Sequence, residues 1–352
     1  MSRHGRRPSS RTVWLVAVSA VILALVAAVA VMARPGQAPP TATPSQPAAF
    51  SPPAVTSPPA ASSRPAAVPS RTPTEAAPST WRPEIRSWAY QLQDYPDGRL
   101  DKLAAGPYQL VVVDLARDAH ADYFTAAEIA RVRATGKRVL AYFEIGSIED
   151  FRPEYPVLRR DAPDLIANEW AEWPGEFFVR YYDERWWSLV VRPRVEQALR
   201  AGFDGVYLDT PLAYEQLDLA AAQDRDRAGL ARAMAGLIVR ISQYAKSRHP
   251  GFLVVPQNSP ELRHQPGYTA AVDGIGMEEL FYQATDERCT ADFCAENLAE
   301  TRALRDAGKF VLSVDYATRS ADVRSACARY RAERFAGTVT VLDLDRPSPP
   351  CP

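Results

Sequence analysis

The sequence predicts an α/β protein whose main domain is a (β/α)8 barrel, also called a TIM barrel, preceded by a hydrophobic segment and a proline-rich linker. Over residues 81–352, apolar β-rich runs alternate with helical runs, which predicts parallel strands joined by right-handed crossovers. Eight runs read as strands, and eight is the number that a closed barrel needs. The alternative is an open doubly wound sheet, but no glycine-rich phosphate loop follows the first run.

Each predicted strand is a short run of β-branched, aromatic and aliphatic residues bounded by turn residues. The eight runs are 87–93, 110–115, 138–145, 205–209, 252–257, 274–280, 310–315 and 338–344. Helices are predicted at 125–135, 184–201, 225–247, 291–307 and 320–335. Thr125 is the expected N-cap of the first helix, and glycines that suit C-terminal caps follow four of the helices, at Gly136, Gly202, Gly308 and Gly337.

The N-terminal residues predict a membrane anchor. Residues 1–12 are basic, with four arginines and no acid, and residues 13–33 carry no charge. That apolar run is long enough to span a bilayer, and its basic flank predicts a cytoplasmic N-terminus with the rest of the chain outside. Small residues at Ala28, Ala30 and Ala33 leave a cleaved signal and a secreted product as the alternative.

Residues 34–80 consist mainly of Pro, Ala, Ser and Thr, which predicts an extended, disordered spacer before the domain at 81–352. The net charge of the whole chain is −1. A general nucleic-acid binder needs a strongly basic surface, so we expect no nucleic-acid partner. We expect a monomer.

A small repeated pattern predicts the catalytic pair. Residues 204–209 and residues 273–278 each place Asp-Gly before a short apolar strand that ends on a carboxylic acid. Side chains alternate along a strand, so Asp209 and Glu278 share the interior face of a barrel, whereas Glu279 takes the opposite face. Paired carboxylates at strand ends are typical of enzymes that cleave glycosidic bonds.

Other polar and aromatic residues gather at the same predicted strand ends. The remaining acids there, which with the pair would attract a cationic substrate, are Asp114, Glu144, Asp315 and Asp343. Aromatic rings stack on the apolar faces of sugars, and amides bind hydroxyls; the candidates are Tyr90, Gln91, Tyr142, Tyr207, Gln257 and Asn258. Glu144 is either a ligand of the substrate or the partner of an arginine such as Arg152 or Arg180.

The four cysteines lie on the predicted exported side, where disulfides persist. Three pairings are open. Cys289 with Cys294 would close the loop after the sixth strand, and Cys327 with Cys351 would then tie the last helix to the C-terminal tail. No Cys-x-x-Cys spacing occurs, so we expect no zinc site and no cofactor.

Several separated motifs, in the right order, resemble the endo-α-1,4-polygalactosaminidases of glycoside hydrolase family 114. They lie at residues 88–93, 136–142, 201–209 and 254–258. The resemblance implies a TIM-type barrel that hydrolyses α-1,4-linked galactosamine-containing polysaccharide without a metal, with catalytic carboxylates at Asp209 and Glu278. Residues 144–147 depart from the family pattern. The chain has Glu144-Ile145-Gly146-Ser147, where many relatives have the small residue first and the acid last. This exchange leaves the details of the sugar-binding subsites open.

We assign Asp209 as the carboxylate that attacks or stabilises the anomeric carbon and Glu278 as the general acid and base. Two strand ends of the same parity in one small barrel should bring the carboxylates close, which favours retention over inversion. Two other functions fit the same residues: a non-catalytic glycan-binding barrel at the cell surface, and a hydrolase of a different glycan.

Overall fold

The computed structural model describes residues 84–223 and 225–351. The predicted cytoplasmic segment at 1–12, the apolar segment at 13–33 and the linker at 34–80 all lie outside those residues. Among the residues that are described, no helix combines the length and the apolar character that crossing a bilayer requires.

All eight predicted barrel strands are present in the described part of the chain. They are β1 (Trp88–Gln91), β2 (Leu110–Asp114), β3 (Arg138–Glu144), β7 (Gly205–Asp209), β8 (Leu253–Pro256), β9 (Gly274–Glu278), β12 (Phe310–Tyr316) and β13 (Ala336–Thr340). They form two parallel sheets, in the orders β1-β2-β3-β7-β8 and β13-β12-β9. A parallel bridge between Gln257 and Gly276 links β8 to β9, and the Leu92 N–H donates to the Leu344 carbonyl oxygen near the other edges.

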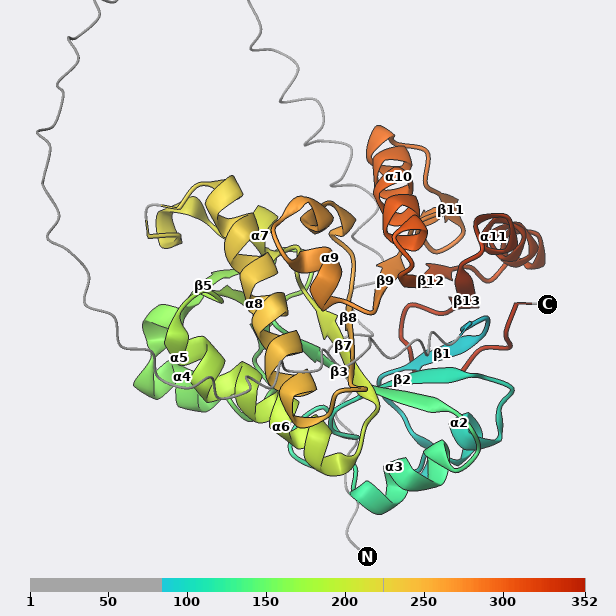
Figure 1. The fold of residues 1–352 in the computed structure, drawn as a ribbon, viewed down its shortest axis with the longest axis horizontal. Coiled ribbons are helices and arrows are strands. Elements are labelled where there is room, and N and C mark those ends of the chain that lie inside the picture. The colour runs from blue at the N-terminus through green and yellow to red at the C-terminus, as the bar shows by residue number, and fades with distance from the viewer. Residues whose placement is uncertain (1–83, 224, 352) are drawn as a thin grey trace, which may run out of the picture. The chain divides into compact units, whose positions relative to one another are not determined.

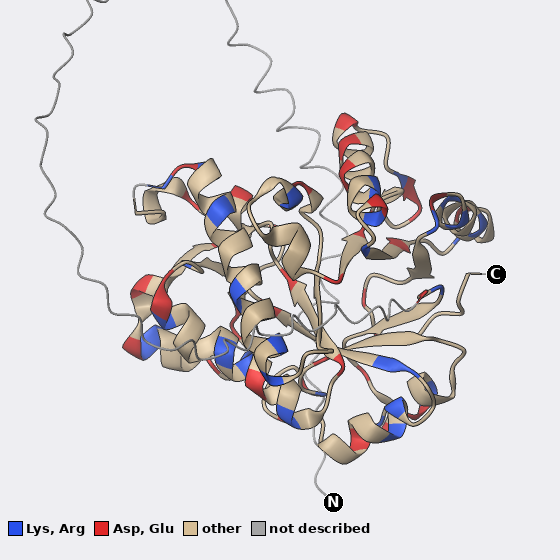
Figure 2. Ribbon diagram, viewed as in Figure 1, with Lys and Arg blue, Asp and Glu red and all other residues tan. Residues whose placement is uncertain are grey.

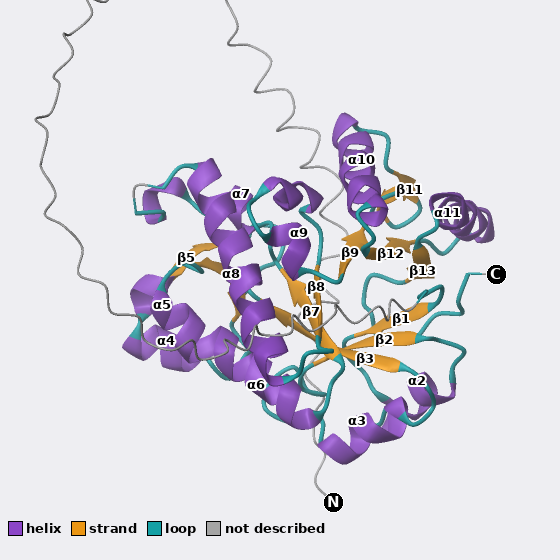
Figure 3. Ribbon diagram, in the orientation of Figure 1, coloured by secondary structure: helices purple, strands orange, loops and turns teal. Residues whose placement is uncertain are grey.

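Helices surround the strands, as Figures 1 and 3 show. They include α3 (Ala126–Arg133), α6 (Arg192–Ala201), α8 (Arg227–Arg248), α10 (Asp292–Asp306) and α11 (Ser320–Glu333). Thr125 caps α3 through a reciprocal capping box with Glu128, as its position predicts. The helix predicted at 184–201 is divided into α5 (Glu184–Trp186), a π-helical segment (Trp187–Val191) and α6, and Gly202 ends it in the left-handed conformation.

The last helix and strand correct the prediction. Helix α11 ends at Glu333, with Arg334 in the left-handed conformation, so Gly337 is not its cap. Gly337 lies inside β13, where an added Cβ would come within 1.8 Å of the Tyr330 ring. A glycine at this point therefore serves the close packing of α11 on β13 rather than a turn. Strand β13 also ends at Thr340, so Asp343 lies beyond it.

Short elements that the sequence did not predict lie between the strands of the two parallel sheets. Between β3 and β7 is an antiparallel sheet of β4 (Ser147–Glu149), β6 (Glu176–Val179) and β5 (Ile166–Glu169), with α4 (Tyr155–Asp161) after β4. After β9 come β10 (Tyr282–Ala284) and β11 (Glu287–Arg288), which form a hairpin. Runs of two to four residues are too short to give a clear alternation of apolar and polar residues.

Buried residues form two apolar clusters that follow the strand parity. One cluster, called the interior cluster here, lies on the strand faces that point away from the helices and includes Trp88, Tyr90, Val112, Leu140, Tyr142, Tyr207, Val255, Val314 and Tyr316. The other lies between the strands and the helices and includes Val206, Leu208, Ile275 and Met277. The alternation predicted for β7 and β9 is confirmed, because Tyr207 faces inward and its neighbours face the helices.

Two disulfides join the four cysteines. Cys289 pairs with Cys294, and Cys327 pairs with Cys351. The first closes the segment between β11 and the start of α10, and the second ties α11 to the C-terminal tail. The pairing considered at the sequence level is thereby selected from the three that were open.

Candidate active site

Asp209 and Glu278 are the last residues of β7 and β9, with β8 between them. Both are partly exposed, whereas the residues before them in each strand are buried. Each ends the inward-facing row of its strand: Asp209 is two residues beyond Tyr207 of the interior cluster, and Glu278 pairs in register with Val314 of the same cluster. The two carboxyl groups therefore stand at the carboxyl ends of the parallel strands, where barrel enzymes place their chemistry.

Glu278 is held by neighbours from β12 and from the end of β8. The Tyr316 hydroxyl from β12 donates to Oε1, and Gln257 Nε2 donates to Oε2 at 2.5 Å. Gln257 is in turn oriented by the Tyr90 hydroxyl of β1, which donates to its Oε1 at 3.0 Å. The Asn258 side-chain oxygen accepts from the Glu278 backbone N–H at 2.9 Å. The carboxyl group has little freedom to move from this position.

The surroundings of Glu278 favour its neutral form. Burial is the main cause, followed by the carboxyl groups of Glu279, Asp209 and Asp315, and together they raise the pKa of Glu278 well above the ordinary 4.5. A carboxyl that keeps its proton near neutral pH can donate it to a leaving group, which is the property of a general acid.

Asp209 has a different set of partners. The Tyr142 hydroxyl of β3 donates to Oδ2, and the Thr210 backbone N–H donates to Oδ1 at 2.7 Å. Hydrogen bonds donated to both oxygens stabilise a carboxylate anion. Each of the two strand-end acids is thus held by hydrogen bonds at both oxygens, and the raised pKa of Glu278 suits that residue to donating a proton.

Tyr207 lies beneath this pair. Its ring is fully buried in the interior cluster, and its hydroxyl has no hydrogen-bond partner among the residues that the structure describes. An added Cβ at Gly276 would come within 2.1 Å of that hydroxyl. Gly276 is therefore required because the Tyr207 side chain crosses to β9 and occupies the space that a larger residue would need.

We expect Gly276→Ala to lower the free energy of unfolding by about 1–3 kcal/mol, because the added methyl group overlaps a fully buried ring that cannot move aside. The matched control is Gly236→Ala in α8, where an added Cβ meets no atom within 4 Å. That change should leave stability unaltered or raise it by up to about 1 kcal/mol, since alanine favours a helix. Urea unfolding measures both; equal midpoints for wild type and Gly276→Ala would contradict this packing.

Glu279 lies just beyond the end of β9. Its φ is +58°, so the regular alternation of the strand ends at Glu278. Burial, followed by the carboxyl groups of Asp315 and Glu172, raises the pKa of Glu279 to about 8. The interaction with Glu172 links this residue to the segment between β5 and β6, which the sequence had not associated with the site.

Asp114 and Glu144 are not open to a substrate. Both are buried, and Arg152 bridges them at 3.0 Å and 2.6 Å respectively. The second Glu144 oxygen bonds Arg194 of α6 at 2.8 Å. The ion-pair alternative for Glu144 is therefore the one observed, with Arg152; Arg180 lies 3.6 Å from Asp164 instead.

Asp315 and Gln91 likewise stabilise the fold and do not face a substrate. Asp315 is fully buried and accepts from the N–H groups of Phe281 and Tyr282, both at 2.8 Å, and from the Tyr330 hydroxyl at 2.6 Å. Gln91 is buried and donates to the carbonyl oxygens of Gln93 and Asp345 at 3.1 Å. The sequence could have shown that both side chains face outward, because neighbouring side chains in a strand point to opposite faces. Asp315 adjoins the inward-facing Tyr316, and Gln91 adjoins the inward-facing Tyr90.

Tyr316 and Thr210 were not among the predicted site residues. Tyr316 could have been found by parity, because it is two residues beyond Val314, which faces the interior. Nothing in the sequence marked Thr210, whose contacts come from a different part of the chain. Within residues 84–223 and 225–351, no group of three or more His, Cys, Asp or Glu side chains is arranged to hold a metal ion.

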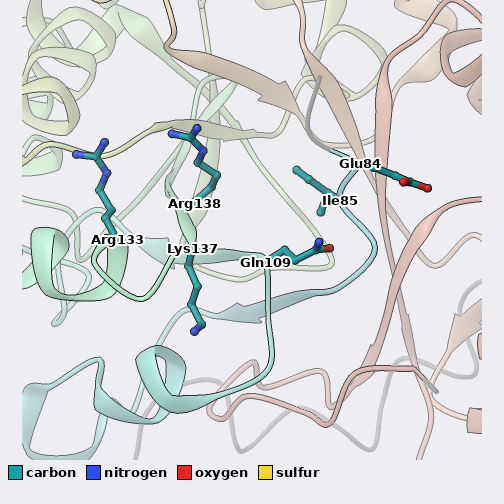
Figure 4. Close-up of a pocket in the computed structure, with 7 residues that line it drawn as sticks. Glu84, Ile85, Gln109, Arg133, Lys137 and Arg138 are labelled. Carbon is teal, nitrogen blue, oxygen red and sulfur yellow. The ribbon is translucent and has the colours of Figure 1, made fainter. Parts of the chain in front are cut away.

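A cavity of about 400 Å³ lies elsewhere, at the N-terminal ends of the first strands (Figure 4). It is lined by Glu84, Ile85, Gln109, Arg133, Gly136, Lys137 and Arg138. Both arginines are paired with buried Asp204, at 3.1 Å and 2.8 Å. This end of a β/α fold usually contributes to stability rather than to chemistry. Figure 2 shows acidic and basic segments interspersed over the outer helices.

Two carboxyl groups at the carboxyl ends of parallel β/α strands are the arrangement typical of a glycoside hydrolase. The chain belongs to glycoside-hydrolase family GH114, whose family model matches residues 70–352. It is 34% identical over 279 residues to an uncharacterized protein of Deinococcus radiodurans, covering 79% of this chain and 85% of the relative. It is 29% identical over 235 residues to the uncharacterized protein MJ1477 of Methanocaldococcus jannaschii, covering 65% and 66% of the two chains.

Solved structures show the same fold. The glycoside hydrolase domain of PelA from Pseudomonas aeruginosa superimposes with a TM-score of 0.60 at 17% identity, covering 74% of this chain and 97% of that domain. Aspergillus fumigatus Ega3, in a complex with galactosamine, superimposes with a TM-score of 0.59 at 16% identity, covering 77% and 97%.

Proposed function

We propose that this protein hydrolyses α-1,4-linked galactosamine-containing polysaccharide outside the cell, with Asp209 and Glu278 as the catalytic pair. The observation that carries the proposal is the pair itself: Asp209 and Glu278 end β7 and β9 at the carboxyl ends of the parallel strands, and burial with the neighbouring carboxyl groups raises the pKa of Glu278. In this proposal the two parallel sheets constitute one (β/α)8 barrel and the protein acts as a monomer without a cofactor.

The proposed reaction retains the anomeric configuration. Glu278 donates its proton to the glycosidic oxygen while a carboxylate oxygen of Asp209 bonds to the anomeric carbon and the glycosidic bond breaks. Glu278, now ionised, then takes a proton from a water molecule whose oxygen displaces Asp209 from the sugar. Tyr142 and Tyr316 hold the two carboxyl groups in position throughout.

The family membership and the fold shared with Ega3, which was solved with galactosamine, support an amino sugar as the substrate. Unacetylated galactosamine units carry ammonium groups, which donate hydrogen bonds to carboxyl oxygens, and the carboxyl groups of Asp209, Glu278 and Glu279 lie close to one another at this site. Tyr142 and Tyr316 are buried, and their hydroxyl groups donate to Asp209 and Glu278, so these tyrosines position the acids rather than offer ring faces to a sugar.

Incubation of the purified protein with deacetylated galactosaminogalactan, and in parallel with chitosan and with peptidoglycan, tests the proposal through the appearance of new reducing ends. We expect the wild-type protein to release reducing ends from galactosaminogalactan. The Asp209→Asn and Glu278→Gln variants should release none from that polymer. Release from chitosan or peptidoglycan alone would identify a hydrolase of another glycan. Binding without release from any polymer would identify a glycan-binding barrel.

We also expect the chain to be anchored in the membrane, because residues 13–33 carry no charge and follow a basic flank. Fractionation of the producing cells should leave full-length protein in the membrane pellet, and external protease should cleave it within residues 34–80. A soluble product that begins near residue 34 would show a cleaved signal instead.

A further inference from the structure

Thr210, the residue after Asp209, combines two properties that rarely occur together. Its φ is +60°, a conformation that a β-branched side chain seldom adopts, and it is buried, with 1% of its surface exposed. Such a conformation persists only where surrounding contacts impose it, and it is often found beside functional groups. The contacts of Thr210 therefore need an explanation.

The hydroxyl group of Thr210 contacts three groups from two parts of the chain. It accepts from the Gly146 N–H at 3.0 Å, and it lies 3.0 Å from Ser147 Oγ and 2.8 Å from the Asp209 carbonyl oxygen. Ser147 is itself bonded to Glu176 of β6 at 2.5 Å. The end of β7 is thereby joined to the antiparallel sheet of β4, β6 and β5.

Gly146 makes this close approach feasible. An added Cβ there would come within 2.2 Å of the Thr210 carbonyl oxygen and 2.5 Å of Ala213 Cβ. The backbone of the β3–β4 connection therefore lies directly against Thr210, and the two segments fix each other. The Thr210 N–H, placed by the same conformation, donates to Asp209 Oδ1 at 2.7 Å.

We infer that Thr210 is a positioning residue for Asp209: its hydroxyl ties the end of β7 to the β3–β4 connection, and its N–H then holds one carboxylate oxygen. This inference rests on the proposed function, in which Asp209 attacks the anomeric carbon. Thr210 is too buried to touch a substrate, so its effect passes through Asp209. A nucleophile that is displaced by a fraction of an ångström loses rate while substrate binding is retained.

Thr210→Val and Thr210→Ser form the matched pair that tests this, because valine keeps the shape without the hydroxyl and serine keeps the hydroxyl. We expect Thr210→Val to lower kcat about 10- to 100-fold with KM changed less than about threefold, and Thr210→Ser to keep kcat within about threefold. A Thr210→Val enzyme with the kcat of wild type, or a Thr210→Ser enzyme impaired equally, would overturn the inference.

Crystal structures of both variants provide a readout that does not depend on activity. In Thr210→Val the Asp209 carboxylate should move away from the N–H of residue 210, and in Thr210→Ser it should remain. An unmoved Asp209 in Thr210→Val would refute the positioning role. If the wild-type protein cleaves no polymer, the proposed function fails, while these structures still decide the role of Thr210. Should Thr210→Val not fold, Ser147→Ala removes one partner of the hydroxyl and is expected to show a smaller shift of the same kind.

Discussion

Asp209→Asn and Glu278→Gln are each expected to fold normally and to lose about 1,000-fold or more of the hydrolytic rate, measured as reducing ends released from galactosaminogalactan. The asparagine cannot attack the anomeric carbon, and the glutamine cannot donate a proton to the glycosidic oxygen. Glu279→Gln is the matched control, because it adjoins Glu278 and makes the same chemical change. It should retain most of the activity.

Stability gives an independent check on Glu278. A group whose pKa is raised on folding contributes stability that is fully present below its ordinary value of 4.5 and is lost as the pH rises through the raised value. We therefore expect Glu278→Gln to melt at a higher temperature than wild type at pH 7, and the difference to vanish near pH 4. Glu279→Gln should behave likewise across the range from 4.5 to about 8.

The activity and stability measurements together distinguish the role of Glu278 from that of Glu279. If Glu279→Gln is the inactive variant and Glu278→Gln is active, the assignment from strand parity is wrong by one residue. If both are inactive, Glu279 also takes part in the reaction or in binding, and its conformation at φ +58° would then have a functional origin.

Arg152→Met is expected to lower the free energy of unfolding by about 3–5 kcal/mol, as measured by urea unfolding. The Arg152 side chain is 6% exposed and lies 3.0 Å from Asp114, 2.6 Å from Glu144 and 2.9 Å from Glu149. Removing the guanidinium group leaves buried carboxyl groups without their shared partner, and a buried charge that has lost its partner is costly.

Arg160→Met is the control for this change. Arg160 pairs with Asp161 at 2.7 Å, but its side chain is 71% exposed, so water replaces the lost contact and stability should hardly change. Arg152→Lys keeps the charge but cannot reproduce the forked hydrogen bonds, and we expect an intermediate loss. Equal unfolding midpoints for Arg152→Met and Arg160→Met would show that the cluster does not stabilise the fold.

The sequence predicted the site best where the evidence was local. Side chains alternate between the two faces of any strand. Tyr207 and Asp209 therefore share one face of β7, and Val206 and Leu208 share the other, whatever strands lie beside it. The same rule, applied to Tyr90 and Tyr316, would have excluded Gln91 and Asp315. Glycine after a helix was a weaker guide, because Gly202 ends a helix and Gly337 lies in a strand.

By itself, then, the sequence determined the order of the eight parallel strands and of the longer helices, the parity of Asp209 and Glu278, and the family to which the chain belongs, because periodicity and short motifs are carried by neighbouring residues. Only the tertiary structure decided that Arg152 bonds Asp114 and Glu144, that Tyr316, Gln257 and Tyr90 orient Glu278, and that Thr210 meets Gly146. Those contacts join residues far apart in the chain, and both their geometry and the burial that raises the pKa of Glu278 exist only once the strands have packed together.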